Sequence, residues 1–353
     1  MMNNQAPRPL SRGFSLIELL VGLVIGMIAV IVMMQVLSVS EGYKRTTTGG
    51  DSAQNNGAIA LYGLQREMRQ AGHGLNTSTI IGCNVTLRAG VTVNNLGPVV
   101  INHPDISGKG EDPNTDTLLI AYGATNDGPE GDRIEAKPLQ TVYTLAGFAG
   151  AASAPSFAVG DRVVAQIAGR PSPCALSMET VTAVALSNVT VATGVAGTTG
   201  GGLFNLGQAP TVLAYAVRDG SLTVCNYMLN NCGGVFNAAH WVRVAGNVVS
   251  LRAEYGRDTT AGTMNGTVDV FDQTQPATAC AWLRTRAVRF ALVARSAQLE
   301  KNNVDAPAPT WAGNGTAPID LSSDAAWQRY RYKTFETTVP LRNMAQMGVT
   351  PGC

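Results

Sequence analysis

Residues 12–37 read RGFSLIELLVGLVIGMIAVIVMMQVL, and Glu18 is the only charged residue in this stretch after Arg12. The apolar run continues past Gln35 to about Val39, which is close to the ~20 residues that a helix needs to cross a bilayer. A carboxylate inside a membrane is costly and usually has a partner. The sequence therefore predicts a membrane-length helix and raises the question of what Glu18 pairs with.

A secretory signal peptide is the other interpretation of this segment. Such a signal has a shorter apolar core followed by a cleavage site of small residues, whereas no A-x-A pattern follows this run. The candidate processing point precedes the run, in the polar leader MMNNQAPRPLSRG. Cleavage there would leave the apolar helix attached to the chain.

The composition argues against several function classes. The 353 residues include 25 Lys and Arg against 24 Asp and Glu, so a formal charge of +1 gives no general field that attracts nucleic acid or acidic lipid. The 39 glycines indicate many turns. The six cysteines form no CxxC pair, which argues against zinc, and their even number favours disulfides in an oxidising compartment.

A second helical stretch is expected after the apolar run. Gly49–Gly50 predicts a kink or break, Asp51 and Ser52 are candidate caps, and helical spacing then continues to about Ala71. The apolar positions on one face are Leu61, Leu64, Met68, Ala71 and Leu75. This pattern predicts an amphipathic helix that lies on a sheet and ends at Gly72-His73-Gly74.

Beyond residue 75 the chain consists of short β-type runs separated by Gly, Asn, Asp and Pro. Nine runs are expected to form strands: 84–93, 116–122, 161–168, 179–186, 211–217, 221–228, 247–255, 286–295 and 331–339. Residues 103–132 and 192–202 read as flexible or exposed loops. The absence of βαβ alternation predicts an α+β fold with antiparallel strands.

No constellation of residues indicates an enzyme. The three histidines, His73, His103 and His240, lie far apart in the sequence. There is no GxSxG elbow, no lysine after a phosphate-binding glycine loop and no GxGxxG before a helix. We therefore expect no catalytic residues and no cofactor.

An acidic stretch is the candidate metal site. Its carboxylates are Asp105, Glu111, Asp112, Asp116, Asp127, Glu130 and Asp132. Hard oxygen ligands at this density suit calcium, but their spacing does not match an EF-hand loop. The prediction is a solvated loop without a metal, and a calcium site is the alternative.

Basic residues concentrate on two expected strands. Arg284, Arg286, Arg289 and Arg295 lie on or beside one, and residues 329–333 (RYRYK) on the other. Strand alternation places Tyr330 and Tyr332 on one face, toward the core, and the cations toward water. Nucleic-acid binding needs aromatic and basic groups presented together, so the pattern argues against it.

Cys225 and Cys232 flank the turn-like sequence NYMLNN and form the best local disulfide candidate. Closing so short a loop stabilises a fold by roughly 2–3 kcal/mol when the geometry is unstrained. The pairing of Cys83, Cys174, Cys280 and Cys353 cannot be read from the sequence.

The N-terminal motif resembles the class III leader of type IV prepilins. Gly13-Phe14-Ser15-Leu16-Ile17-Glu18 follows a short basic leader and precedes an apolar run. The resemblance implies that a peptidase cuts after Gly13 and methylates the new amino terminus at Phe14. It also implies that Glu18 is the assembly residue. A positive amine at Phe14 then gives Glu18 a partner, within one helix or on a neighbouring subunit.

Further segments resemble the PilW-type minor pilins. They are residues 66–74, 115–122, 159–184, 213–222, 248–258, 286–296 and 331–343, in the same order as in that family. Residues 90–114 and 259–279 match nothing recognisable. The resemblance implies a pilin-like α+β fold with a leader (1–13), a transmembrane and assembly helix (14–39), a periplasmic amphipathic helix (40–74) and a β-rich globular domain (75–353).

The same resemblance implies a function and partners. A PilW-type minor pilin joins other minor pilins and the major pilin to prime type IV pilus assembly, with an expected place at the tip. Its other implied partners are prepilin peptidase, the inner-membrane assembly platform and the inner membrane itself, which it leaves for the fibre at the cell surface. The alternatives are a J-type pseudopilin of type II secretion and a tip adhesin or DNA-binding module.

Overall fold

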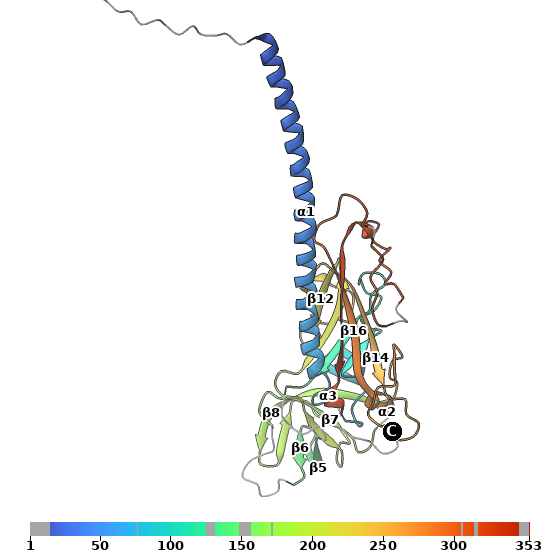
Figure 1. Ribbon diagram of the computed structural model, residues 1–353. Helices are drawn as coiled ribbons and strands as arrows, with labels where there is room; N and C mark the ends of the chain where they lie inside the picture. Colours follow the sequence, from blue (N-terminus) through green and yellow to red (C-terminus); the bar gives the residue numbers. More distant parts are fainter. Residues whose placement is uncertain are drawn as a thin grey trace, which may run out of the picture. The chain divides into compact units, whose positions relative to one another are not determined.

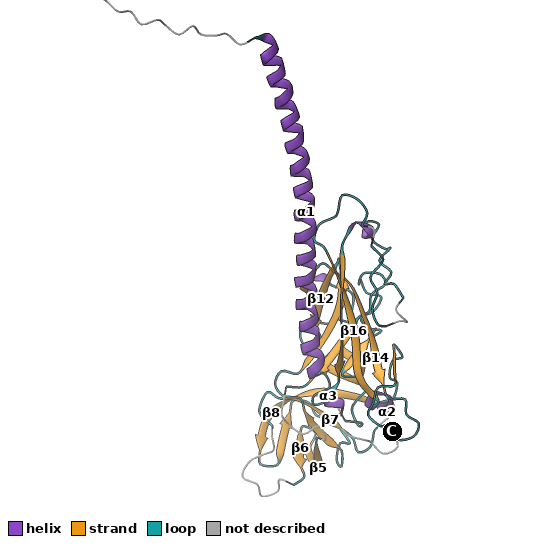
Figure 2. Cartoon of the chain, viewed as in Figure 1, coloured by secondary structure: helices purple, strands orange, loops and turns teal. Residues whose placement is uncertain are grey.

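The computed structural model describes residues 15–75, 77–124, 131–147, 157–170, 172–304, 306–313, 317–345 and 353. The chain divides into two compact units, Met1–Gly49 and Gly50–Cys353. Over its described residues the first unit is helical, whereas the second contains the end of that helix and every described strand (Figure 2).

Helix α1 (Leu16–Gln70) is a single element, so the break predicted at Gly49–Gly50 is wrong. Each glycine destabilises a helix by about 1 kcal/mol relative to alanine but, unlike proline, keeps its backbone N–H. The pair therefore weakens the helix without removing a hydrogen bond. The predicted end is confirmed, because Gly72 and Gly74 adopt the left-handed φ angles of +81° and +69° that favour glycine.

The α+β class is confirmed, and the strands form three sheets. The eight-stranded sheet has the order β2 (Val91–Leu96), β1 (Cys83–Arg88), β8 (Ala175–Ala185), β7 (Arg162–Gln166), β10 (Gly202–Asn205), β5 (Asp132–Leu139), β6 (Val142–Leu145) and β9 (Asn188–Val191). Its β1–β8 pair is parallel, which departs from the expected antiparallel arrangement. Strands β5 to β8 gather at the lower end of Figure 1.

The two smaller sheets are antiparallel in all their described pairs. One has the order β13 (Val242–Gly246), β12 (Ser221–Asn226), β11 (Thr211–Arg218), β4 (Leu118–Tyr122) and β3 (Val99–Ile101). The other has the order β15 (Val270–Asp272), β14 (Val248–Arg257), β16 (Thr285–Arg295) and β17 (Tyr332–Pro340). The short helices are α2 (Ala279–Leu283), α3 (Arg342–Ala345) and the 3-10 turns Ala238–His240 and Trp327–Arg329.

All nine expected runs overlap strands, but β3, β5, β6, β9, β10, β13 and β15 were not expected. The Gly/Thr stretch 192–202 is mostly exposed, as predicted, yet it lies tightly against neighbouring backbone. A Cβ atom at Gly194 would lie 1.9 Å from the Gln140 carbonyl oxygen, and one at Gly201 would lie 1.8 Å from that of Gln166. These glycines are therefore needed because neighbouring backbone approaches too closely for any side chain, and not only because they make the segment flexible.

The main core joins the second half of α1 to strands of all three sheets, and Trp282 is its largest fully buried side chain. A Cβ atom at Gly82 or Gly97 would lie within 2.8 Å of the indole, so these glycines make room for it. The indole Nε1 donates to Asn95 Oδ1 over 3.1 Å, which satisfies the buried polar atom. A smaller second core lies among β5 to β10.

Three disulfides lie within Gly50–Cys353: Cys83–Cys174, Cys225–Cys232 and Cys280–Cys353. The first and third span 91 and 73 residues, and the second spans 7. In the chain-entropy account the long loops each contribute roughly 4–5 kcal/mol and the short loop roughly 2–3 kcal/mol. The globular unit is therefore covalently constrained between segments that are distant in sequence.

Candidate functional site

The start of α1 carries the candidate assembly residue. Gly13 and Phe14 lie outside the described residues, whereas Glu18 is described and lies exposed in the first helical turn. The first backbone bond of the helix runs from the Leu19 N–H to the Ser15 carbonyl over 3.1 Å. A carboxylate in the first turn interacts favourably with the positive end of the helix dipole.

The apolar run shows no inward-facing stripe. Large side chains on every side of the helix from Leu16 to Val39 are more than half exposed within the chain. A helix that is apolar all round belongs in a membrane or in a packed bundle. Among the described residues, α1 is the one helix long and apolar enough to cross a membrane.

Two glycines continue the face on which Glu18 lies. Gly22 and Gly26 follow it at successive intervals of four residues, a spacing that keeps side chains on one side of a helix. A Cβ atom at either glycine would meet nothing within 4 Å. This face therefore carries a carboxylate followed by two positions without a side chain, where another helix can approach closely.

The second half of α1, by contrast, has one buried face. Leu64, Met68 and Ala71 are at most 1% exposed, and Leu75 is buried beyond the helix end, as the stripe predicts. Gly57 also faces the sheet, since a Cβ atom there would lie 2.1 Å from Cε2 of Phe335 on β17. The amphipathic pattern thus places this half on the globular unit to which it belongs.

Polar contacts fix the last turn of α1. Tyr122 Oη donates to Glu67 Oε2 over 2.5 Å, and Asn343 Nδ2 donates to the carbonyls of Gln70 and Ala71 over 2.9 and 3.0 Å. The Gln70 carbonyl also accepts from the His73 N–H over 3.2 Å, so Asn343 of α3 adds to the hydrogen bonds that close the C-terminal end of α1. The sequence did not predict that Tyr122 or Asn343 would contact the end of α1. For Asn343, the one available signal was its place at the end of the segment 331–343, which resembles the PilW-type pilins.

Burial of the Tyr122 phenol, reinforced by its hydrogen bond to Glu67, raises the pKa of Tyr122 to about 12. The neutral phenol is therefore the form that the folded unit favours. The contact holds Glu67 at the edge of the buried stripe and couples the end of α1 to β4.

Several carboxylates of the acidic stretch accept hydrogen bonds within the chain. Asp112 accepts hydrogen bonds from the backbone of Asp219 and Gly220, and Glu111 from that of Gly108 and Lys109. Asp127 and Glu130 lie outside the described residues. Within the described segments no group of three potential metal-ligating side chains is found.

The basic residues are largely committed to contacts within the chain. Arg284, Arg289 and Arg295 form ion pairs with Asp258, Glu254 and Asp324, respectively. Tyr330 and Tyr332 are half-buried whereas Arg331 and Lys333 are exposed, so the predicted separation of aromatic and basic groups holds there. Arg295 also stacks on Tyr330, with its guanidinium carbon 4.3 Å from the ring centroid, while its Nη1 pairs with Asp324.

Two family models match segments of the chain. Residues 214–343, from within β11 to α3, match the family described as Type IV Pilus-assembly protein W, or PilW. Residues 8–34 match the prokaryotic N-terminal methylation motif. No curated protein is significantly similar in sequence. The type IV-like pilin TTHA1219 from Thermus thermophilus aligns at 10% identity over 82% of this chain and 96% of its own, with a TM-score of only 0.29.

Proposed function

The chain is a type IV pilus minor pilin of the PilW family, and on that basis we propose that it helps to prime assembly of the pilus and sits at its tip. Its methylation motif and apolar helix associate it with the membrane and with the pilus. As a pilin it interacts with other pilins and with the assembly machinery. The residues that would carry these interactions lie in the first half of α1.

The observation that supports the mechanism is the single carboxylate in an otherwise uncharged apolar run. In the proposal, the leader is cut after Gly13 and the new amine at Phe14 is methylated. Glu18 then pairs with the amine of a neighbouring subunit as the apolar helices bundle. A buried ion pair contributes little net stability, but an unpaired buried charge is strongly unfavourable, so the pair specifies register.

Partners and location follow from the same mechanism. Prepilin peptidase would process the leader, and other minor pilins, the major pilin and the inner-membrane platform would contact the mature chain. Before incorporation, Gly50–Cys353 would lie in the periplasm. The three disulfides of this unit suit an oxidising compartment.

Replacing the carboxylate tests the mechanism. Glu18→Gln should leave cleavage after Gly13 intact but lower the amount of the protein in sheared fibres by about tenfold or more, because the neighbouring amine loses its charged partner. Glu41→Gln is the matched control, since Glu41 is an exposed glutamate of the same helix beyond the apolar run. Fibre and membrane fractions are compared by quantitative immunoblotting.

Equal incorporation of the Glu18→Gln variant and the wild-type chain, with normal piliation, would contradict charge pairing. Loss of exoprotein secretion on deletion of the gene, with unaffected pili, would instead support the pseudopilin alternative.

A further inference from the structure

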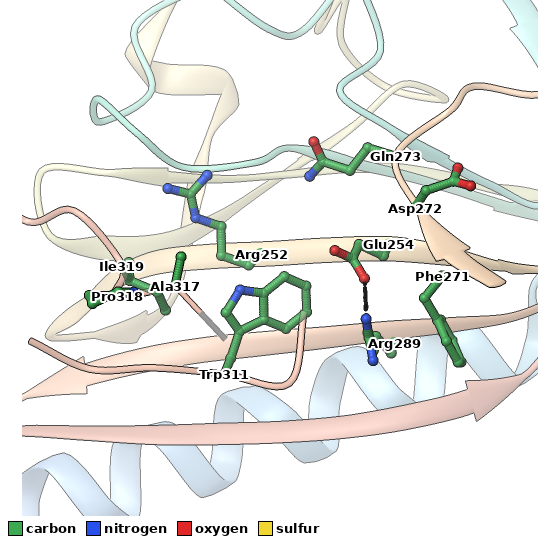
Figure 3. A pocket seen from close by; sticks show the side chains of 10 residues that line it. All are labelled: Arg252, Glu254, Phe271, Asp272, Gln273, Arg289, Trp311, Ala317, Pro318 and Ile319. Carbon is green, nitrogen blue, oxygen red and sulfur yellow. Dashed lines mark hydrogen bonds and ion pairs between the residues drawn. The ribbon is translucent and has the colours of Figure 1, made fainter. Parts of the chain in front are cut away.

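A cavity of about 490 Å³ lies on the outer face of the four-stranded sheet (Figure 3). Alternation along β14 creates this face, because Leu251 and Ala253 enter the main core whereas Arg252 and Glu254 project to the other side. Phe335 of β17 pairs with Leu292 and faces α1, so the cavity lies on the side of the sheet away from the helix.

Segments from four parts of the sequence line the cavity. Strand β14 and Arg289 of β16 form its floor, while Phe271 and Gln273 line it from β15 and the segment after that strand. Trp311 and Pro318 line it from the connection between β16 and β17 (Figure 3). Its volume is in the range of about 300–1,000 Å³ that is typical of small-molecule sites.

Arg289 is held in place and neutralised. Its Nε and Nη2 both donate to Glu254 Oε2, over 2.9 and 2.6 Å, and the two residues are directly opposite in the β14–β16 register. The guanidinium also lies 4.4 Å from the Phe271 ring centroid and 5.7 Å from that of Trp311. Arg289 therefore lies over the Phe271 ring, whereas Trp311 is only 6% exposed and packs in a hydrophobic cluster on this face.

Arg252 has unused hydrogen-bonding capacity. Within the described part of the chain it makes an ion pair but no hydrogen bond, and its Nη1 is 3.9 Å from Asp116 Oδ1. Asp116 already accepts hydrogen bonds from Asn102 Nδ2, the Ala253 N–H and Gln273 Nε2, over 2.8–2.9 Å. The Arg252 side chain is 24% exposed and lines the cavity, so its donors remain available to a bound molecule.

Gln273 supplies the complementary acceptor. Its Nε2 donates to Asp116 Oδ2 and to the Ala253 carbonyl, which fixes the amide and leaves Oε1 to accept. The charges on the lining balance, since it carries two cationic side chains, Arg252 and Arg289, and two carboxylates, Glu254 and Asp272. Asp272 is itself paired with Arg257. A balanced lining favours a neutral polar ligand over an anion or a cation.

We propose that this cavity binds a ring of a neutral saccharide. A sugar ring carries hydroxyls that both accept from Arg252 and donate to Gln273 Oε1. The inference goes beyond assembly, because it gives the globular unit a recognition role that requires no other pilin subunit.

Binding to the purified full-length chain in detergent micelles tests the inference. The probes are maltotriose, cellotriose and mannotriose, measured by calorimetry and by tryptophan fluorescence. At least one should bind. Arg252→Gln should weaken it by about tenfold or more, because a guanidinium donor pair is lost. Ala317→Trp should abolish binding, because Ala317 is an exposed lining residue and the larger side chain fills the cavity.

Arg331→Gln is the matched control, since Arg331 pairs with Glu300 outside the cavity and should leave affinity unchanged. Unfolding midpoints establish that each variant is folded. The inference is overturned if no neutral trisaccharide binds, if binding survives Ala317→Trp, or if only trigalacturonate binds. None of these results depends on fibre incorporation, so they are distinguishable from a failure of the Glu18 mechanism.

Discussion

The two halves of α1 have the same secondary structure and opposite patterns of burial. In the first half, Leu23 and Met27 are 54% and 59% exposed, whereas in the second half Leu64 and Met68 are 1% and 0% exposed. The first half is apolar on every side, and the second is apolar mainly on one. Helix formation alone therefore does not decide where a segment packs; the distribution of apolar residues around the helix does.

This contrast assigns different tasks to the two halves. Side chains of the second half have their partners within Gly50–Cys353, so substitutions there should act on folding. Those of the first half make no comparable contacts within the described part of the chain, so substitutions there should act on membrane insertion and subunit packing. Matched substitutions of the same residue type, at positions with different surroundings, test this distinction.

The methionine pair should give the largest difference. Met68→Ala removes a fully buried side chain and should lower the free energy of unfolding by about 2–5 kcal/mol, through lost burial and a residual cavity. Met27→Ala should change it by less than about 0.5 kcal/mol. Urea unfolding in detergent micelles, followed by the four tryptophans, measures both; all four lie at or beyond residue 241. Similar losses in both variants would remove the distinction.

A glycine pair within the second half should give a smaller difference. Gly57→Leu forces a side chain into the Phe335 ring and should destabilise the unit by about 1–3 kcal/mol through overpacking. At Gly63 an added Cβ meets nothing within 4 Å, so Gly63→Leu should be neutral or stabilising because leucine favours the helix. The same unfolding assay applies, and equal destabilisation by both would show that α1 is not seated at Gly57.

The smallest effect should come from Tyr122→Phe, which removes the hydrogen bond to Glu67 and should cost about 1 kcal/mol at pH 7. The pKa of Tyr122 is raised from its ordinary value of 10.0 to about 12, first by burial and then by this bond. The protonated phenol therefore stabilises the fold fully below pH 10, and this contribution is lost as the pH rises toward 12.

Unfolding of wild-type and Tyr122→Phe chains across pH 8–12 measures that contribution. The wild-type chain should lose more stability than the variant between pH 10 and 12. Buried Tyr215 and Tyr255, whose pKa values burial also raises, contribute to both curves, so the difference between them is the informative quantity. Parallel curves would show that Tyr122 does not titrate with folding.

Local pattern was sufficient to predict the long helix, its end and nine strand regions, because each carries a clear period in its apolar residues. Strand β5 was missed since DRIEAKPL has one fully buried residue and an internal proline, so it offers no alternation to read. The predicted helix break at Gly49–Gly50 was wrong because glycine lowers helix propensity without preventing a helix. The long-range disulfides join positions 91 and 73 residues apart, and no local signal specifies such pairing.

The two candidate sites also differ in how widely their residues are spread along the sequence. Glu18 and its apolar surroundings are contiguous in the sequence, so their pattern could be read directly. The outer-face cavity combines Arg252, Gln273, Arg289 and Trp311, which are up to 59 residues apart and converge through the β14–β16 register and the connection before β17. Phe271 and Gln273 also belong to the segment 259–279, in which the sequence shows no recognisable motif.

Mass spectrometry of the N-terminal peptide, from sheared surface fibres and separately from inner membranes, tests the central claim most directly. The account predicts a peptide that begins at Phe14 with an N-methylated amine and is present in the fibre fraction. Confinement of that peptide to membranes would contradict incorporation into the pilus. An intact leader that retains Gly13 in both fractions would contradict processing altogether and leave α1 as a membrane anchor.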